Sequence, residues 1–403
     1  STHCISSAAS DVYKRQLKAD MVTGNVQQRK EVLDRWKEVD VLITSYDLLR
    51  RDITDYQELH FFCEVIDEAQ YIKNHGTQAA RAVKQVQTGF RLALTGTPIE
   101  NRLSELWSIF DYLMPGYLYS YQRFRTELEQ PIVQHKDEDA AKRLQRLIRP
   151  FVLRRLKKEV LQDLPDKLEE NLYADMDGEQ QELYDAHVRR MKLMLEEKSD
   201  EEIRTDKIEI LAELTRLRQL CCDPALLYDN YKGGSAKTEL VRGLIRNAVE
   251  NGHKVLLFSQ FTTMLERLYR ILEEEKIASH MLTGATPKEK RIEMVESFAH
   301  DEVPVFCISL KAGGTGLNLT AADVVIHFDP WWNSAVQNQA TDRAHRIGQK
   351  NVVNVYRILA KGTIEEKIVE LQERKLQLSD RILGGESLQA QGLTREELLE
   401  LLR

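Results

Sequence analysis

Two arginines in the segment 339–349, which reads QATDRAHRIGQ, have the residue type and spacing for phosphate chemistry. If the segment is helical, Arg343 and Arg346 lie one turn apart, with both guanidinium groups on one face. Paired cations of this kind can neutralise charge on a transferring phosphoryl group. A solvated basic helix has the same spacing, so the interpretation depends on what the rest of the chain supplies.

Two adjacent carboxylates follow an apolar run in the segment 65–70, VIDEAQ. At the carboxyl end of a strand such a pair suits a nucleotide site, where one carboxylate holds Mg²⁺ and the other orients the attacking water. We therefore expect Asp67 to serve the metal and Glu68 to serve the water. An ordinary acidic turn is the alternative.

Three further segments could contact phosphates. The turn LTGTPIEN (94–101) offers hydroxyl groups that can sense the phosphate end of a nucleotide site. SLKAGGTGLN (309–318) has three glycines that let the backbone approach a phosphate, although it lacks the G-K-[ST] ending of a P-loop. TSYD (44–47) has hydroxyl groups and an aromatic ring that can bind phosphates and sugars without reading bases.

The elements that position these segments are short apolar runs, each followed by a helical pattern. They are residues 41–44, 61–66, 91–94, 255–258, 305–308, 324–328 and 353–358. Continuous apolarity is typical of strands buried on both faces, and therefore of parallel sheets covered by helices. The pattern predicts an α/β fold with two units, 17–118 and 236–365, separated by a helical insertion and linker over 119–235. Residues 366–403 read as a charged amphipathic helix, and residues 1–16 as non-native or disordered sequence.

Composition narrows the class of protein. The 403 residues carry a net charge of −7, are 42% hydrophobic and contain no run long enough to span a membrane. Five cysteines without C-x-x-C pairing indicate a reducing, intracellular setting and no zinc site. Between residues 142 and 158 there are eight basic residues and no acidic ones. This stretch is either a solvated face or a phosphate-tracking patch.

In this order, these segments resemble the motifs of the Swi/Snf-type ATPases, DNA translocases of helicase superfamily two. DEAQYIKN (67–74) resembles the Walker B box, TGTP the coupling motif, and QATDRAHRIGQ the last helicase motif. FSQF (258–261), LTGAT (282–286) and DPWWN (329–333) resemble motifs of the second lobe. The resemblance covers nearly everything after residue 20.

The resemblance implies two RecA-like lobes, the first incomplete, a helical insertion and a brace-like C-terminal helix, with ATP between the lobes. It implies catalytic roles for Asp67, which also binds Mg²⁺, for Glu68, and for Arg343 and Arg346 as arginine fingers. Nucleotide-binding or coupling roles fall to Gln70, Thr95, Gly96, Thr97, Gly314, Gly316 and Gln339. DNA contacts fall to Thr44, Ser45, Tyr46, Ser259, Arg291, Lys311, Thr315, Asn318 and Trp332.

The activity implied is ATP-dependent translocation along double-stranded DNA that displaces bound proteins without processive strand separation. The displaced proteins would be nucleosomes in a eukaryotic nucleus or RNA polymerase in a bacterial nucleoid, and the compact insertion favours the bacterial setting. Two alternatives remain open: a non-catalytic DNA-binding scaffold without a P-loop, and a strand-separating helicase of the wider superfamily.

The family's G-x-G-K-T loop, which holds the β- and γ-phosphates, has no counterpart ahead of Asp67. We expect that this sequence is the C-terminal part of a longer ATPase, and that the 403-residue chain by itself hydrolyses little or no ATP. The measurement is phosphate release by the pure chain with and without duplex DNA. DNA-stimulated turnover would contradict the expectation.

Overall fold

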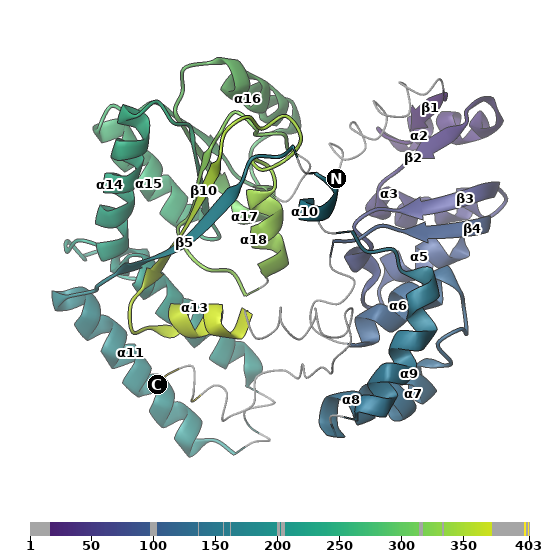
Figure 1. Ribbon diagram of the computed structural model, residues 1–403, viewed down its shortest axis with the longest axis horizontal. Coiled ribbons are helices and arrows are strands. Elements are labelled where there is room, and N and C mark those ends of the chain that lie inside the picture. The colour runs from purple at the N-terminus through teal and green to yellow at the C-terminus, as the bar shows by residue number, and fades with distance from the viewer. Residues whose placement is uncertain are drawn as a thin grey trace. The chain divides into compact units, whose positions relative to one another are not determined.

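The computed structural model describes residues 17–96, 103–135, 137–155, 157–161, 163–199, 202, 206–313, 317–332, 334–372, 399 and 402 (Figure 1). Within them the chain forms two compact units. The first comprises residues 17–154, and the second residues 155–372 with residues 399 and 402. Each is described by itself.

The second unit is built on a six-stranded sheet in which every pairing is parallel. The strand order is β5-β10-β9-β6-β8-β7. The strands are β5 (Lys167–Ala174), β6 (Val255–Ser259), β7 (Ser279–Leu282), β8 (Val305–Ser309), β9 (Val324–His327) and β10 (Val353–Ala360). The sheet confirms the prediction of a parallel α/β fold.

Helices cover both faces of this sheet, which is why its central strands are apolar throughout. Leu257 and Ile326 pack on one face against α14 and α15. Leu256 and Val325 pack on the other against α16, α17 and α18. The helices are α14 (Ala236–Glu250), α15 (Thr262–Glu274), α16 (Lys288–His300), α17 (Leu310–Gly313) and α18 (Ser334–Thr341).

One part of the predicted helical insertion is a strand. Residues 167–174 form β5, which pairs with β10 along its whole length. The sequence KLEENLYA has too many charged residues to read as a buried strand, but charged residues are typical of a sheet edge, where they hinder pairing with other chains. The short strand β7, at the other edge, was also not predicted. The rest of the insertion in this unit is largely helical: α10 (Lys157–Val160), α11 (Gly178–Glu197), α13 (Lys207–Cys222) and a 3-10 turn over Pro224–Leu226.

Helices α11 and α13 share one apolar cluster with the chain that follows β10. Met191 and Leu195 of α11 meet Leu214 and Leu217 of α13, and Ile364 packs against them. Residues 364–372 are helical. Among the described residues no helix combines the length and apolarity needed to cross a bilayer.

The first unit contains two short parallel pairs of strands instead of one wide sheet. β1 (Ala19–Met21) pairs with β2 (Val41–Ile43), and β3 (His60–Ile66) pairs with β4 (Gln87–Ala93). One side of β3 and β4 is apolar yet open to solvent, with Val65 at 54% and Phe90 at 55% exposure.

Helices surround these strands and continue into a small helical cluster. They are α2 (Val26–Asp34), α3 (Tyr46–Arg51), α4 (Ile53–Tyr56), α5 (Gln78–Gln85), α6 (Leu103–Leu113), α7 (Tyr121–Phe124), α8 (Gln130–His135) and α9 (Glu138–Ile148), with a π-helical turn over Arg125–Glu129. Leu106 and Phe110 of α6 join the core of this cluster, while Ile109 and Tyr112 face the core under the strands. Thus α6 holds the cluster and the strands together.

A carboxyl group on β3 makes the stability of the first unit depend on pH. Glu64 lies 3.5 Å from Arg91 of β4, and both side chains are mostly buried. Burial raises the pKa of Glu64 to about 7, although Arg91 opposes the shift. Because this pKa is above that of the unfolded chain, the folded state holds the proton more tightly. The contribution of Glu64 to the free energy of unfolding is therefore fully present at acidic pH and is lost as the pH rises through about 7.

We predict that Glu64→Gln removes this decline and makes the first unit more stable than wild type at alkaline pH. Arg91 keeps acceptors in the variant, because it also donates to the carbonyls of Tyr112 and Val86. The measurement is urea unfolding between about pH 5 and about pH 8, followed by hydrogen exchange of β3 and β4. An unchanged pH dependence in the variant would contradict the assignment to Glu64.

Candidate functional site

The predicted motifs of the first unit follow the carboxyl ends of three strands. Thr44, Ser45 and Tyr46 come after β2, the acidic pair after β3, and Thr95 with Gly96 after β4. Since β3 and β4 are parallel neighbours, their carboxyl ends share one edge. The fold therefore brings the acidic box and the coupling turn together.

A chain of hydrogen bonds links the acidic pair to the coupling turn. The Gln70 amide donates to a carboxylate oxygen of Glu68 at 2.6 Å, and the Thr95 hydroxyl donates to the amide oxygen of Gln70 at 2.9 Å. Glu68 adopts a left-handed backbone conformation, with φ of 51°. Its N–H donates to the Asp67 carboxylate at 2.8 Å. A change at the Glu68 carboxylate can thus reach Thr95 through a single side chain.

Tyr46 connects the segment after β2 to the same place. Its hydroxyl donates to the carbonyl of Asp67 at 2.8 Å, and its ring stacks on Tyr71 with centroids 5.4 Å apart. Burial, with the nearby charge of Asp67, raises the pKa of Tyr46. Ser45 has a local role, because its side chain caps α3 by accepting a hydrogen bond from the N–H of Leu48.

The carboxylates here fit a magnesium ion held largely by water. The Asp67 side chain is exposed, so it can reach an ion without being freed from a buried partner. Among the described residues, no group of three or more His, Cys, Asp or Glu side chains is arranged to hold a metal. Mg²⁺ suits such a site, because it keeps several waters and commonly takes only one or two carboxylates.

The motifs of the second unit also follow strand ends, around the point where the strand order reverses. Ser259 ends β6, the glycine-rich segment follows β8, and Asp329 lies just after β9. The chain runs from β6 to the β7–β8 side of the sheet and then crosses to β9 and β10 on the other side. In open parallel sheets, ligands bind at such switch points, outside the carboxyl ends of the strands.

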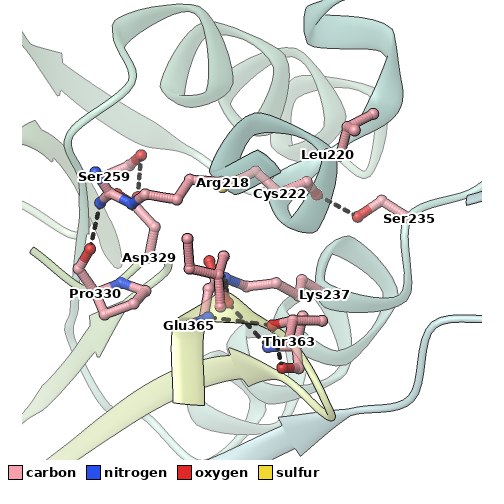
Figure 2. A network of polar contacts seen from close by, with 12 residues as sticks. Arg218, Leu220, Cys222, Ser235, Lys237, Ser259, Asp329, Pro330, Thr363 and Glu365 are labelled. Atoms are coloured by element: carbon pink, nitrogen blue, oxygen red, sulfur yellow. Dashed lines mark hydrogen bonds and ion pairs between the residues drawn. The ribbon is translucent and has the colours of Figure 1, made fainter. Parts of the chain in front are cut away.

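Ser259 does not present its side chain to a ligand, which corrects the DNA contact predicted for it. The residue is fully buried. Its hydroxyl donates to the carboxylate of Asp329 at 2.5 Å and accepts from the N–H of Phe261 (Figure 2). Ser259 lies where an apolar strand ends and a polar turn begins, so the sequence could not show whether its hydroxyl faces the core or a ligand.

The other predicted DNA contacts of this unit differ in their surroundings. Trp332 is half-buried against the cluster under α11 and α13, and Asn318 is exposed. Arg291 donates to the carbonyls of Thr283, Gly284 and Thr286, so it braces the turn after β7.

Thr97, Gly314, Thr315 and Gly316 lie outside the described residues, as does the side chain of Lys311, whose backbone is in α17.

The spacing predicted that the two arginines lie on one helical face, and the structure shows that they do not. Gln339 lies within α18, but that helix ends at Thr341, and Arg343 and Arg346 lie in the turns that follow. In these turns, carbonyl groups bond to side chains. Gln349 donates to the carbonyl of Ala344, and Lys157 donates to that of His345. Both arginines are half-buried.

The arginine turns are fastened to the chain that leads into β5. Lys157 also donates to the carboxylate of Asp342 at 2.7 Å, and a ring nitrogen of His345 donates to the carbonyl of Pro165 at 2.7 Å. Sequence analysis missed Lys157 as a site residue. Its only signal was membership of the basic stretch 142–158, where its partners could not be seen.

The fold and these sites define a class of protein. It is an α/β protein whose polar motifs gather at the carboxyl ends of parallel strands, where open α/β sheets bind their ligands. The SNF2-related domain family matches residues 9–226, and the helicase conserved C-terminal domain matches residues 236–348. The chain therefore belongs to the SNF2-related family, as its motifs had predicted.

Two curated relatives show how far the similarity extends. The uncharacterized ATP-dependent helicase MG018 of Mycoplasma genitalium is 39% identical over 94% of this chain and 36% of its own length. The human SWI/SNF-related matrix-associated actin-dependent regulator of chromatin subfamily A member 1 is 34% identical over 91% of this chain and 36% of its own length. The chain thus spans little more than a third of these relatives.

Among solved structures, the Sulfolobus solfataricus SWI2/SNF2 ATPase core in complex with dsDNA is 35% identical. The match covers 94% of this chain and 80% of that chain, with a TM-score of 0.47.

Proposed function

We propose that the protein carrying this chain is an ATP-dependent motor that moves along double-stranded DNA and remodels protein–DNA complexes. The observation that supports it best is the hydrogen-bond path from Glu68 through Gln70 to Thr95, beside the bond from Tyr46 to Asp67. The path joins a residue proposed to activate water to the proposed coupling turn, and the separate Tyr46 bond holds a proposed DNA contact beside it. Names of relatives, such as the helicase of Mycoplasma genitalium, agree with ATP use.

The roles follow from the chemistry of each group. Asp67 holds Mg²⁺ through water, and Glu68 orients the water that attacks the γ-phosphate. Arg343 and Arg346 supply cations that neutralise charge on the transferring phosphoryl group. Gln70 and Thr95, with Gly96, Thr97, Gly314, Gly316 and Gln339, bind the nucleotide or relay its state.

The DNA contacts are proposed to go mainly to phosphates. They involve Thr44, Ser45 and Tyr46 in the first unit and Arg291, Lys311, Thr315, Asn318 and Trp332 in the second. Because phosphate contacts carry no sequence information, binding is expected to be nearly independent of base sequence. The bound proteins that such a motor displaces are proposed to be nucleosomes or RNA polymerase.

A binding experiment tests the DNA part of the proposal with the 403-residue chain. We expect the chain to bind duplexes of unrelated sequence with similar affinity. A plot of the logarithm of the binding constant against the logarithm of the salt concentration should fall with a slope of roughly 0.9 per phosphate contact. Strong preference for one sequence, or for single strands, would contradict the proposal. Binding without any ATP response in a longer form of the protein would favour the non-catalytic scaffold.

Two substitutions test the catalytic part in a protein that carries this chain together with a G-x-G-K-T loop. Glu68→Gln should abolish turnover but leave ATP binding intact, because the amide cannot act on the water. Arg346→Ala should slow turnover on the order of 10³-fold. The measurements are steady-state ATP hydrolysis and nucleotide affinity, with Arg267→Ala as a control outside the site.

Near wild-type hydrolysis by Glu68→Gln, or a loss below about tenfold for Arg346→Ala, would remove that residue from its role. A strand-displacement assay with the same protein separates a duplex translocase from a strand-separating helicase, since only the latter releases a strand.

A further inference from the structure

Arg218 is a buried cation for which the proposed function has no use. It lies on α13, in the helical region between the predicted lobes, and only 3% of its surface is exposed. A buried guanidinium is costly unless it is paired and hydrogen-bonded. Its partners therefore indicate what the chain gains from it.

Those partners are two of the segments singled out in the sequence. Arg218 donates to the carbonyl of Pro330 and lies 3.9 Å from the carboxylate of Asp329, both in the loop after β9 (Figure 2). Its guanidinium carbon is 5.7 Å from the ring centroid of Phe261 and 5.7 Å from that of Trp332. One side chain thus contacts the turn after β6 and the loop after β9.

Asp329 joins the same two segments from the other side. Its carboxylate, fully buried, accepts from the Ser259 hydroxyl at 2.5 Å and from the N–H of Gln260 at 3.2 Å. Strands β6 and β9 are paired directly beneath these segments, with Phe258 opposite His327. Arg218 and Asp329 therefore lock the exits of two adjacent strands to each other and to α13.

We propose that Arg218 is a positioning residue for Trp332. The cation–π contact with the Trp332 ring and the hydrogen bond to the loop that carries it together hold the indole in one orientation, and Asp329 ties the turn at Ser259–Phe261 to the same loop. The inference rests on the proposed function in one respect, which is that Trp332 contacts DNA. It adds that α13, through Arg218, holds the Trp332 side chain in the orientation in which it contacts DNA.

Arginine is suited to this place in a way that lysine is not. Its planar group can lie near two aromatic rings and still donate hydrogen bonds at its edge, whereas an ammonium is a compact point charge. Arg218→Lys should therefore keep the charge beside Asp329 yet position Trp332 less well than wild type. Arg218→Met removes both effects and keeps most of the volume.

The chain offers a matched control, an arginine that pairs with the residue at the C-terminal end of α13. Arg267 of α15 pairs at 3.0 Å with Asp223, the residue that follows α13. Arg267→Met removes one arginine from the same unit, with the same change of charge, so effects of charge alone will appear in both variants.

The first measurement does not involve DNA. Hydrogen exchange is compared in the 403-residue wild type, Arg218→Met, Arg218→Lys and Arg267→Met. In Arg218→Met we expect at least a severalfold faster exchange at 259–261 and 329–332, and in Arg218→Lys a smaller increase there. In neither Arg218 variant should exchange change at β8 (Val305–Ser309). Unchanged exchange, or an equal increase at β8, would overturn the proposal.

The second measurement is a double-mutant cycle on duplex binding. Arg218→Met should weaken binding about tenfold in the wild-type background and less than about twofold when Trp332 is already alanine, because Arg218 acts through Trp332. The salt dependence should stay that of wild type, since a buried arginine contacts no phosphate. Additive losses, or a reduced salt slope, would overturn the positioning role.

The two measurements fail separately. If wild type binds no duplex DNA, the proposed function is refuted, while the exchange experiment still decides whether Arg218 orders the two segments. If wild type binds and Arg218→Met binds equally well, the proposed function stands and the positioning role is refuted.

Discussion

A buried ion pair between Lys237 and Glu365 is the constraint on which the second unit depends. Both side chains have no exposure, and the ammonium lies 2.8 Å from the carboxylate (Figure 2). Burial by itself would lower the pKa of Lys237, but the charge and hydrogen bonds of Glu365 outweigh it and the pKa is raised. Removal of one partner would strand the other charge, which typically costs about 3–5 kcal/mol. The pair therefore fixes the start of α14 relative to the chain after β10.

That constraint extends to the face where the motifs gather. Lys237 lies 5.0 Å from the ring of Phe328, and the next residue, Asp329, belongs to the network of Arg218 and Ser259. Cations and carboxylates thus alternate from the helical layer to the strand exits. Since each buried charge is acceptable only while its partner stays in place, helices and motif loops hold one another in position.

The first unit solves the same problem with fewer buried charges. Its motifs depend on neutral side chains, with Gln70 between Glu68 and Thr95 and the Tyr46 hydroxyl on the carbonyl of Asp67. Asp67 remains exposed. The acidic box is thus accessible and locally ordered, whereas the segments after β6 and β9 are ordered by burial. The proposed nucleotide site needs the first property, and the proposed DNA contact at Trp332 needs the second.

The sequence by itself determined the family, the parallel sheet and the strand ends where Asp67, Glu68, Thr95 and Asp329 lie. Unbroken apolar runs are typical of strands in parallel sheets, and polar motifs directly after neighbouring parallel strands share an edge. Tertiary structure decided the rest. β5 looked helical because its charges suit a sheet edge that only β10 defines. Arg343 and Arg346 lie in turns after α18, where Gln349 and Lys157, the latter remote in sequence, donate to the carbonyls of Ala344 and His345. Ser259 and Arg218 gained their places from partners 70 and 112 residues away in sequence, and no local pattern records such contacts.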